Sequence, residues 1–364
     1  MARFLILSAS MGDGHDAVAR ALAARLDGQG HDAVAVDALR LLPGPAAGAA
    51  LRGFYQGCIR HAPWIYAALY AGFFRPRAHP GANPLASVMG PRLLALVRRL
   101  RPDLVVPVFH LAAQVTGRER ALGRLEVPSA VVVTDFAVHR QWLHPGNDQY
   151  LCLTRPAADL AGAGTGRPAR AVGAVLADRF LPPRAPVRHP APGPPRVLLS
   201  AGAWGAGTRF EQTAGCLTAA GFTPMVLCGR NERLRRRLDG LPGVTALGWQ
   251  RDLPALLARS AALIDNAAGQ TALQALALGV PVVAYRPLPG HGREGVRAMA
   301  DLGLSRLART PAELVAALQD AALQDAARRT DRAEGGPAAP WSTAAARLFP
   351  GTAAAVLAEL ADDG

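Results

Sequence analysis

Two loops rich in small residues could bind an anionic ligand through their backbone amides. The first loop, residues 265–271, joins a short apolar segment at 262–264 to a helix that begins at Thr271. The second loop, residues 288–293, follows the next apolar segment at 281–285. A helix that starts directly after a strand offers free N–H groups and the positive end of its dipole. An ordinary βαβ turn would explain the first loop alone, but two such loops at neighbouring strand ends predict a nucleotide site.

Ionisable side chains gather at predicted strand ends in the N-terminal half. The apolar segment 3–8 predicts a buried strand, and His15 follows in the first turn of a helix, after two glycines that would let a ligand approach the backbone. Later apolar segments end at or just before His110, Asp135 and His139. A single carboxylate after a strand is more often a helix cap. Several ionisable groups on one rim instead predict a site for acid–base chemistry.

Alternating strands and helices must position these side chains. Short, continuous apolar segments are typical of parallel strands buried on both faces. They occur at 3–8, 32–36, 104–109, 129–134, 150–153, 171–175, 196–199, 223–227, 244–247, 262–264 and 281–285. A proline-rich stretch separates the two groups and predicts a linker. The predicted organisation is an N-terminal domain (1–180), a linker (181–195), a C-terminal domain (196–338) and a closing segment (339–364). The closing segment is predicted to form a helix from Trp341 to Leu360, and one expectation is that this helix packs on the N-terminal domain.

Composition limits the class of protein. The chain has 364 residues, half of them apolar, which predicts a globular protein of two-domain size. The formal net charge of +13 would favour nucleic acid or an anionic membrane, but every basic residue is arginine, which indicates biased codon usage. Without a zinc-type Cys/His spacing, we expect no nucleic-acid partner and no metal site. Four separated cysteines, no signal peptide and no span-length apolar run predict a cytoplasmic protein with reduced thiols.

An aromatic and arginine-rich segment, residues 51–77, interrupts the α/β pattern. It holds three of the five tyrosines together with Phe54, Trp64, Phe73 and Phe74, and four arginines lie among them. Aromatic rings beside arginines suit the headgroup level of a membrane, which predicts peripheral association with an anionic surface. A buried pair of helices is the competing interpretation, and the sequence does not decide between them.

Several motifs together resemble the monogalactosyldiacylglycerol synthase branch of the glycosyltransferases, which also includes MurG. They are LSASMGDGH (7–15), PDLVVPVFH (102–110), VVVTDF (131–136) with His139 and Trp142, LCGRN (227–231), the stretch 247–283 and LPGHGREG (288–295). The resemblance implies an α/β chain of GT-B fold, with two Rossmann-like domains facing each other across a cleft. It implies inverting transfer of a hexose from a nucleotide sugar, most simply a UDP-sugar, to a hydroxyl of a lipid or lipid-like acceptor. The donor would be a substrate, and no cofactor or metal is implied.

The resemblance also assigns roles by position. For the chemistry it points to His15, with Asp135 as the base or as the residue that orients His15, and the choice stays open. The acceptor would meet the N-terminal domain, at Gly12, Gly14, His110, His139, Trp142 and, from the aromatic segment, Trp64. The donor would meet the C-terminal domain, at Gly202, Arg230, Gly248, Ala268, Gly269, Gln270, Thr271, Gln274, His291, Gly292 and Arg293.

Three departures from the family pattern concern the donor. Gln274 stands where the family usually has a ribose-binding glutamate, His291 and Gly292 replace a glutamine-containing pair, and Gly295 replaces a common asparagine. These departures leave the sugar and the nucleotide open. The alternatives are a transferase with a soluble natural-product acceptor, a nucleotide-sugar epimerase, and a catalytically silent nucleotide-sugar-binding protein. A lipid acceptor would place the protein at the inner face of the membrane.

Overall fold

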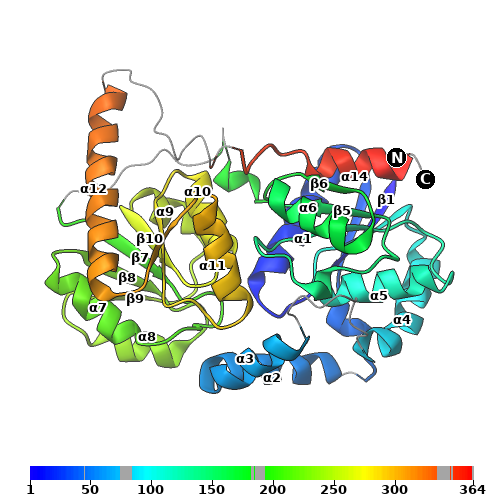
Figure 1. Ribbon diagram of the computed structural model, residues 1–364, viewed down its shortest axis with the longest axis horizontal. Helices are drawn as coiled ribbons and strands as arrows, with labels where there is room; N and C mark the ends of the chain where they lie inside the picture. Colours follow the sequence, from blue (N-terminus) through cyan, green and yellow to red (C-terminus); the bar gives the residue numbers. More distant parts are fainter. Residues whose placement is uncertain are drawn as a thin grey trace. The chain divides into compact units, whose positions relative to one another are not determined.

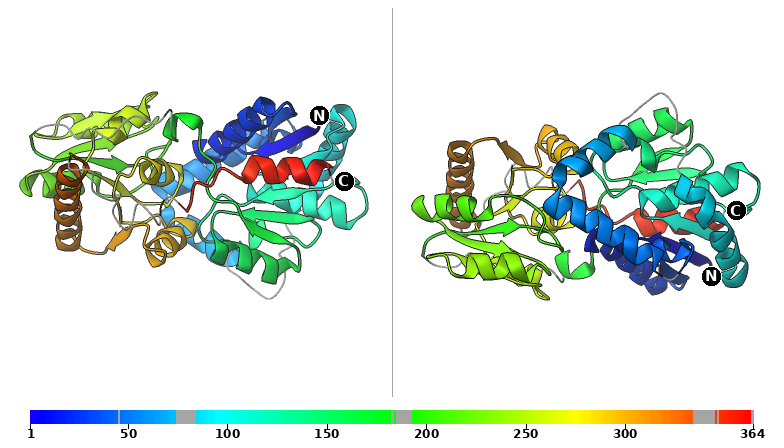
Figure 2. Two further views of the ribbon diagram at one scale, coloured as in Figure 1. Left: turned by 90° about the horizontal axis from the view of Figure 1, so that it is seen from above. Right: turned by 90° about the horizontal axis from the view of Figure 1, so that it is seen from below.

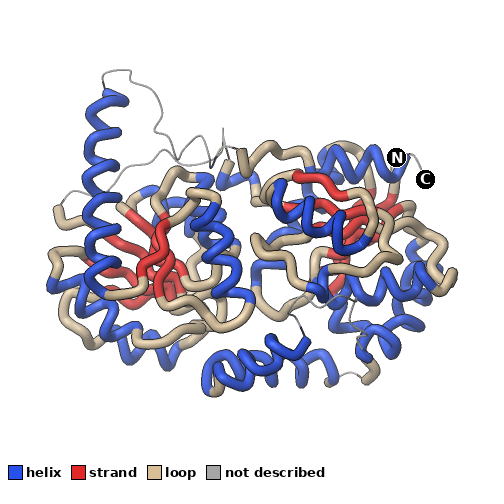
Figure 3. Tube along the Cα trace, in the orientation of Figure 1, coloured by secondary structure: helices blue, strands red, loops and turns tan. Residues whose placement is uncertain are grey.

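The computed structural model describes residues 1–44, 46–73, 84–181, 184, 193–333, 345 and 347–362 (Figures 1 and 3). The chain forms two compact units. Unit 1 comprises Met1–Cys58, Trp64–Ala177 and Leu348–Gly364, and unit 2 comprises Ile59–Pro63 and Asp178–Arg347. The C-terminal segment therefore groups with the N-terminal unit. Most of the predicted linker, 181–195, lies outside the described residues.

Unit 1 is built on parallel strands. Strand β1 pairs with β2 on one side and with β3 on the other, β4, β5 and β6 pair in that order, and a parallel bridge between Val105 and Ser129 joins the two groups. The strands are β1 (Arg3–Ser8), β2 (Asp32–Asp37), β3 (Leu104–Pro107), β4 (Ala130–Val132), β5 (Gln149–Cys152) and β6 (Ala169–Ala171). Because β2 and β3 flank β1 on opposite sides, the topological switch point lies between β1 and β3.

Helices cover both faces of this sheet (Figure 2). Phe4 and Ile6 pack with α1 (Asp13–Gly28) and α14 (Ala353–Asp362), whereas Leu5 and Leu7 pack with α4 (Pro84–Leu100) and α5 (His110–Ala121). Burial on both faces is the reason that the strand is a continuous apolar segment. The unit also contains α6 (Arg155–Thr165) and the short 3-10 helices η1 (Ala38–Leu41) and η2 (Arg140–Trp142).

The aromatic segment forms two consecutive helices, α2 (Ala47–His61) and α3 (Pro63–Phe73). Tyr66 and Tyr70 are buried, and the Tyr66 ring lies 5.6 Å from that of Tyr55. Phe54 and Trp64 are 58% and 72% exposed. The segment thus combines a buried aromatic side with exposed rings, while the side chain of Phe73 and residues 74–77 lie outside the described part of the chain. Among the residues that the structure describes, no helix has the length and apolar character needed to cross a bilayer.

Unit 2 contains one six-stranded parallel sheet in the order β12-β11-β10-β7-β8-β9. The strands are β7 (Arg196–Ser200), β8 (Thr223–Leu227), β9 (Thr245–Leu247), β10 (Ala262–Asp265), β11 (Val282–Tyr285) and β12 (Arg306–Ala308). Its helices are η3 (Asp178–Phe180), α7 (Phe210–Ala219), α8 (Glu232–Asp239), α9 (Leu253–Ala258), α10 (Gln270–Ala277), α11 (His291–Asp301) and α12 (Pro311–Ala333). The chain adds β8 and β9 on one side of β7 and returns to add β10 on the other. The switch point therefore lies between the carboxyl ends of β7 and β10.

Two predicted elements were misplaced. Residues 172–175 are buried but irregular, since β6 ends at Ala171. Helix α14 begins at Ala353, and residues 347–352 before it are not helical, while residues 341–344 and 346 of the predicted helix lie outside the described residues. Pro350 and Gly351, the latter with φ of 73°, separate α14 from the residues before it.

Candidate functional site

His15 lies at the switch point of unit 1, in the first turn of α1. Its Nδ1 is 2.9 Å from the carbonyl oxygen of Val108, just beyond β3, and 3.3 Å from Thr134 Oγ1. A carbonyl oxygen can only accept a hydrogen bond, so Nδ1 carries the ring proton. The neutral ring then keeps a lone pair on Nε2, which is the atom that can accept a proton from a ligand.

The surroundings of His15 favour its neutral form. Burial lowers the pKa of His15 below its ordinary value, and this effect outweighs the opposing influence of the Asp135 carboxylate and the Val108 carbonyl. The ring also packs edge-on against Phe109, with ring centres 5.0 Å apart. His15 is therefore unprotonated near neutral pH, as a general base must be before it reacts.

Asp135 lies just past β4 and is held by two aromatic side chains. Its Oδ2 accepts a hydrogen bond from Trp142 Nε1 at 2.9 Å and lies 3.5 Å from His139 Nε2. Trp142 is fully buried and His139 is 3% exposed. The predicted role of Trp142 as an acceptor contact is therefore not supported, because its ring offers no surface to a ligand. The segment from Asp135 to Trp142 folds back through η2, so the Trp142 indole lies in the core and positions Asp135 by its hydrogen bond.

The structure brings the predicted ionisable residues of unit 1 together. The His110 ring lies 5.1 Å from that of His139, and the Trp142 ring lies 6.2 Å from that of His15. Tyr70 of α3 contacts the His139 ring at 6.2 Å, which connects the aromatic helices to the site. Sequence reasoning missed this tyrosine.

The remaining residues predicted for the acceptor are less informative. Gly12 precedes α1 in extended backbone, and a side chain there would meet no neighbouring atom. Gly14 lies in the first turn of α1. Trp64 is exposed on α3 and makes no ring contact within the described part of the chain.

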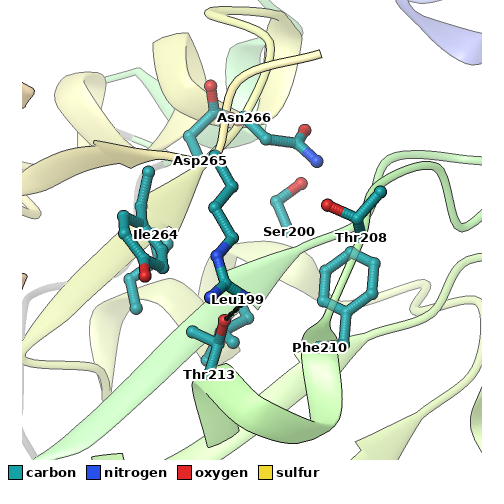
Figure 4. Close-up of a pocket in the computed structure, with 10 residues that line it drawn as sticks. Leu199, Ser200, Thr208, Phe210, Thr213, Ile264, Asp265 and Asn266 are labelled. Carbon is teal, nitrogen blue, oxygen red and sulfur yellow. Dashed lines mark hydrogen bonds between the residues drawn. The ribbon is translucent and has the colours of Figure 1, made fainter. Parts of the chain in front are cut away.

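A small cavity lies at the switch point of unit 2, with room for about one water molecule at about 20 Å³. Figure 4 shows Ser200 from β7 and Asp265 and Asn266 from the end of β10 around it. Asn266 Nδ2 donates to the Ala206 carbonyl at 3.0 Å, which ties the loop after β10 to the loop after β7. Sequence reasoning did not select Asp265 or Asn266, although both end a predicted strand.

The first turn of α11 packs directly on the loop that leads into α10. A Cβ at Gly292 would lie 3.2 Å from the Asn266 carbonyl oxygen, and one at Gly295 would lie 3.3 Å from Ala268 Cβ. This close packing explains why a glycine, and not the asparagine common in the family, stands at position 295. The N-cap residues of α10 and α11 are the glycines Gly269 and Gly290, which have no side chain to cap the helix. The positive ends of the two helix dipoles favour a nearby anion such as a diphosphate.

The other residues predicted for the donor lie around these helices. Gly202 has φ of 65° in the loop after β7, and Gly269 immediately precedes α10. Gln270, Thr271 and Gln274 are half-buried in the first two turns of α10, while His291 and Arg293 begin α11.

Arg230 forms a stack with two indole rings. Its guanidinium lies 4.1 Å from the Trp249 ring centre and 5.3 Å from that of Trp204. Trp249, which follows Gly248 at the end of β9, is 48% exposed. Such a planar, exposed group can stack on another ring, for example a nucleobase. Sequence reasoning selected Arg230 and Gly248 but missed both tryptophans.

Known proteins resemble this chain in sequence and in fold. Residues 15–166 match the family described as monogalactosyldiacylglycerol (MGDG) synthase. A processive diacylglycerol beta-glucosyltransferase of Staphylococcus epidermidis is 24% identical over 336 residues, which are 87% of this chain and 84% of that protein. The glycotransferase of kitacinnamycin matches 99% of both chains with a TM-score of 0.62 and 18% identity. MurG of Acinetobacter baumannii matches 100% of this chain and 99% of its own, with a TM-score of 0.55 and 14% identity.

These matches confirm two predictions from the sequence. The chain resembles the branch that includes monogalactosyldiacylglycerol synthase and MurG, and its fold class is α/β of the GT-B type.

Proposed function

We propose that this chain is an inverting glycosyltransferase that moves a hexose from a UDP-sugar to a hydroxyl group of a lipid acceptor. The observation that carries the proposal is the setting of His15. The Val108 carbonyl fixes the ring proton on Nδ1, and Nε2 is left as a base at a switch point where α/β folds bind ligands. The sequence relatives supply the reaction class, since the Staphylococcus epidermidis protein is named a diacylglycerol glucosyltransferase.

In this mechanism Nε2 of His15 accepts the proton of the acceptor hydroxyl. The hydroxyl oxygen attacks C1 of the sugar from the side opposite the diphosphate, and the bond from C1 to the diphosphate oxygen breaks with both electrons on the leaving group. The positive dipole ends of α10 and α11 favour the negative charge that develops on the diphosphate. The step needs no metal and no cofactor.

Asp135 acts on His15 through its charge. The carboxylate raises the pKa of His15, although burial dominates, so it favours the imidazolium that forms during transfer. Its Oδ2 already accepts the Trp142 N–H. We therefore assign His15 as the base and Asp135 as the group that stabilises the charged ring.

The donor assignment rests on unit 2. A uracil ring could stack on Trp249 and Arg230, and the ribose would meet Gln274 in α10. Gln274 can accept one hydrogen bond from a ribose hydroxyl but supplies no charge, so the ribose is bound more weakly than by a glutamate.

The acceptor assignment rests on the aromatic helices and on the relatives. The exposed rings of Phe54 and Trp64 suit the headgroup level of a bilayer, which would hold the protein at the cytoplasmic face of the membrane. A soluble natural-product acceptor is the second candidate, because the glycotransferase of kitacinnamycin shares the fold.

A donor screen followed by product analysis tests the proposal. Nucleoside diphosphates and their sugars are first ranked by thermal shift and calorimetry, and the best donor is then incubated with diacylglycerol vesicles. We expect UDP-sugars to bind best and mass spectrometry to detect a hexosyl-diacylglycerol, unchanged by EDTA. Conversion of the nucleotide sugar without acceptor would indicate an epimerase, and binding with neither transfer nor hydrolysis would indicate a silent binding protein.

A further inference from the structure

His139 contacts both the Asp135 carboxylate and a ring of helix α3. Its Nε2 lies 3.5 Å from Asp135 Oδ2, the same oxygen that accepts the Trp142 N–H at 2.9 Å. The Tyr70 ring packs on the His139 ring at 85°, with ring centres 6.2 Å apart, and both side chains are buried. Edge-on packing of rings is favourable and directional. The orientation of His139 is therefore set by a carboxylate and by a buried tyrosine.

The two partners of Asp135 Oδ2 are fixed in different ways. Trp142 is fully buried in a core cluster of unit 1. His139 instead lies in extended backbone just before η2, so the direction of its side chain depends on the rings packed against it. In the described part of the chain these rings belong to His110, Trp142 and Tyr70. The first two follow strands β3 and β4, and Tyr70 supplies the contact from the aromatic helices.

A row of three tyrosines, Tyr55, Tyr66 and Tyr70, leads from α2 to His139. Tyr66 lies one turn before Tyr70 on the same side of α3, and its ring is 6.3 Å from that of Tyr70 and 5.6 Å from that of Tyr55. Burial raises the pKa of Tyr55 and of Tyr66, and the Asp135 carboxylate adds to this effect in both. The carboxylate thus acts on these tyrosines as well as on His15.

The position of Asp135 affects the protonation of His15. Burial lowers the pKa of His15, and the Asp135 carboxylate is the strongest of the influences that raise it. If the carboxylate moved away or became hydrated, it would stabilise the imidazolium less, and the pKa of His15 would fall further. The other titratable groups around this carboxylate and ring are Asp16 on α1, Tyr55, Tyr66 and Tyr70 on α2 and α3, His110 on α5, and His139.

We propose that Tyr70 is a positioning residue for the transfer reaction, because its ring holds His139 against Asp135 and thereby keeps the carboxylate where it acts on His15. The inference rests on the proposed function for the identity of the reaction. Tyr70 contacts neither substrate in this account. It acts through His139.

Titration of the His15 ring by NMR tests the proposal and needs no substrate. In the intact protein with isotope-labelled histidine, the His15 signal is the one that is missing from His15→Ala. Tyr70→Leu removes the ring, so His15 should titrate at lower pH than in the wild type. The same variant should have a kcat lower by about 3- to 10-fold, with the Kd for UDP unchanged. Tyr70→Phe keeps the ring and should match the wild type in the His15 titration and in kcat.

The direction of the shift separates positioning from a general loss of packing. If Tyr70→Leu only admitted water to the site, the pKa of His15 would rise, because burial is what lowers it. A raised or unchanged pKa in Tyr70→Leu would overturn the proposal. A Tyr70→Phe variant that behaves like Tyr70→Leu would also overturn it. If Tyr70→Leu does not fold, Tyr70→Met replaces it with the same expected directions, because methionine fills the space without a ring.

The matched control is Phe4→Leu. The Phe4 ring is fully buried in unit 1 and meets the His31 ring at 89°, with ring centres 5.4 Å apart. Phe4 lies near the amino end of β1, whereas His15 follows the carboxyl end of that strand. Phe4→Leu therefore removes a comparable ring contact from a histidine outside the site. It should lower the melting temperature and leave the His15 titration and the Kd for UDP unchanged.

A double-mutant cycle tests the route through His139. His139→Ala removes the ring that Tyr70 holds, so Tyr70→Leu should shift the His15 pKa no further in that background. If the two shifts add, Tyr70 acts on His15 by another route and the proposal fails.

The titration also separates this inference from the proposed function. If the wild type transfers no hexose, the proposed function fails, while the His15 titration still decides whether Tyr70 holds the carboxylate in place. If the wild type transfers hexose and Tyr70→Leu matches it in titration and in kcat, only the positioning role is refuted.

Discussion

Replacing Trp142 by phenylalanine should slow turnover without weakening donor binding. Phenylalanine keeps a ring in the buried cluster but removes the Nε1–H that donates to Asp135 at 2.9 Å. A hydrogen bond to a charged group contributes about 1.5–3 kcal/mol. If that energy holds the carboxylate where it stabilises the His15 imidazolium, kcat should fall by roughly 10- to 100-fold, with the donor Kd unchanged.

Tyr150→Phe is the matched control for Trp142→Phe. Tyr150 belongs to the same core cluster, is fully buried, and donates its hydroxyl to the His144 carbonyl at 2.7 Å. The Tyr150 hydroxyl also accepts from the His144 N–H at 2.8 Å and from Asn147 Nδ2 at 3.3 Å. Tyr150→Phe therefore removes more hydrogen bonds than Trp142→Phe and should lose at least as much unfolding free energy, which is about 1–3 kcal/mol for Trp142→Phe. Steady-state kinetics on both variants measure kcat, and calorimetry measures the donor Kd and the unfolding free energy. Equal losses of turnover would refute a specific role for Trp142, and so would an unchanged kcat in Trp142→Phe.

Four further predictions concern the two sites and the aromatic helices. His15→Ala should lower turnover by roughly 10²-fold, with donor affinity retained. Asp135→Asn should move the acid limb of the pH profile of kcat/KM to lower pH, because the carboxylate raises the pKa of His15. A shift of this acid limb to higher pH would contradict the role assigned to Asp135. Gln274→Glu should tighten UDP by a few-fold, or about 1 kcal/mol, in calorimetry, and unchanged or weaker binding would remove ribose contact from its role. The wild type should bind anionic vesicles in a salt-sensitive way in sedimentation assays, and Phe54→Ser with Trp64→Ser should abolish binding but spare donor affinity.

Much of the fold could be predicted because strands such as β1, β3 and β10 are buried on both faces. The predicted apolar segments 3–8, 104–109 and 262–264 overlap the strands β1, β3 and β10 of the structure. The segment at 172–175 is also buried, but its backbone leaves the extended conformation at Gly173, where φ is 75°, just after the Val172 N–H donates to the Cys152 carbonyl. Helix α14 starts after Pro350 and Gly351, and the sequence pattern did not show that these two residues interrupt the predicted helix.

The site was less accessible to sequence reasoning. The place of His15 after β1 predicted its position at the sheet edge, but only the structure shows which ring nitrogen faces Val108. Trp142 was assigned to the acceptor by the family resemblance, whereas the path of η2 buries its ring. Asp265 escaped notice because a carboxylate after a strand is an ordinary cap.

The aromatic helices show why patterns fail for some segments. Aromatic residues are distributed around both helices, so periodicity could not separate the buried Tyr66 and Tyr70 from the exposed Phe54 and Trp64. Packing of Tyr70 on His139 selects the buried side. Tyr70 and His139 are far apart in the sequence, so a local sequence pattern cannot predict their contact.

The most direct test of the central claim is the structure of the product. The wild type is incubated with UDP-glucose, whose glycosidic bond is α, and with diacylglycerol vesicles, and the glycolipid is examined by NMR. Inverting transfer with His15 as base predicts a β-linked glucosyl-diacylglycerol from the wild type and at least 10²-fold less from His15→Ala. An α-linked product, or transfer at an undiminished rate by His15→Ala, would contradict it.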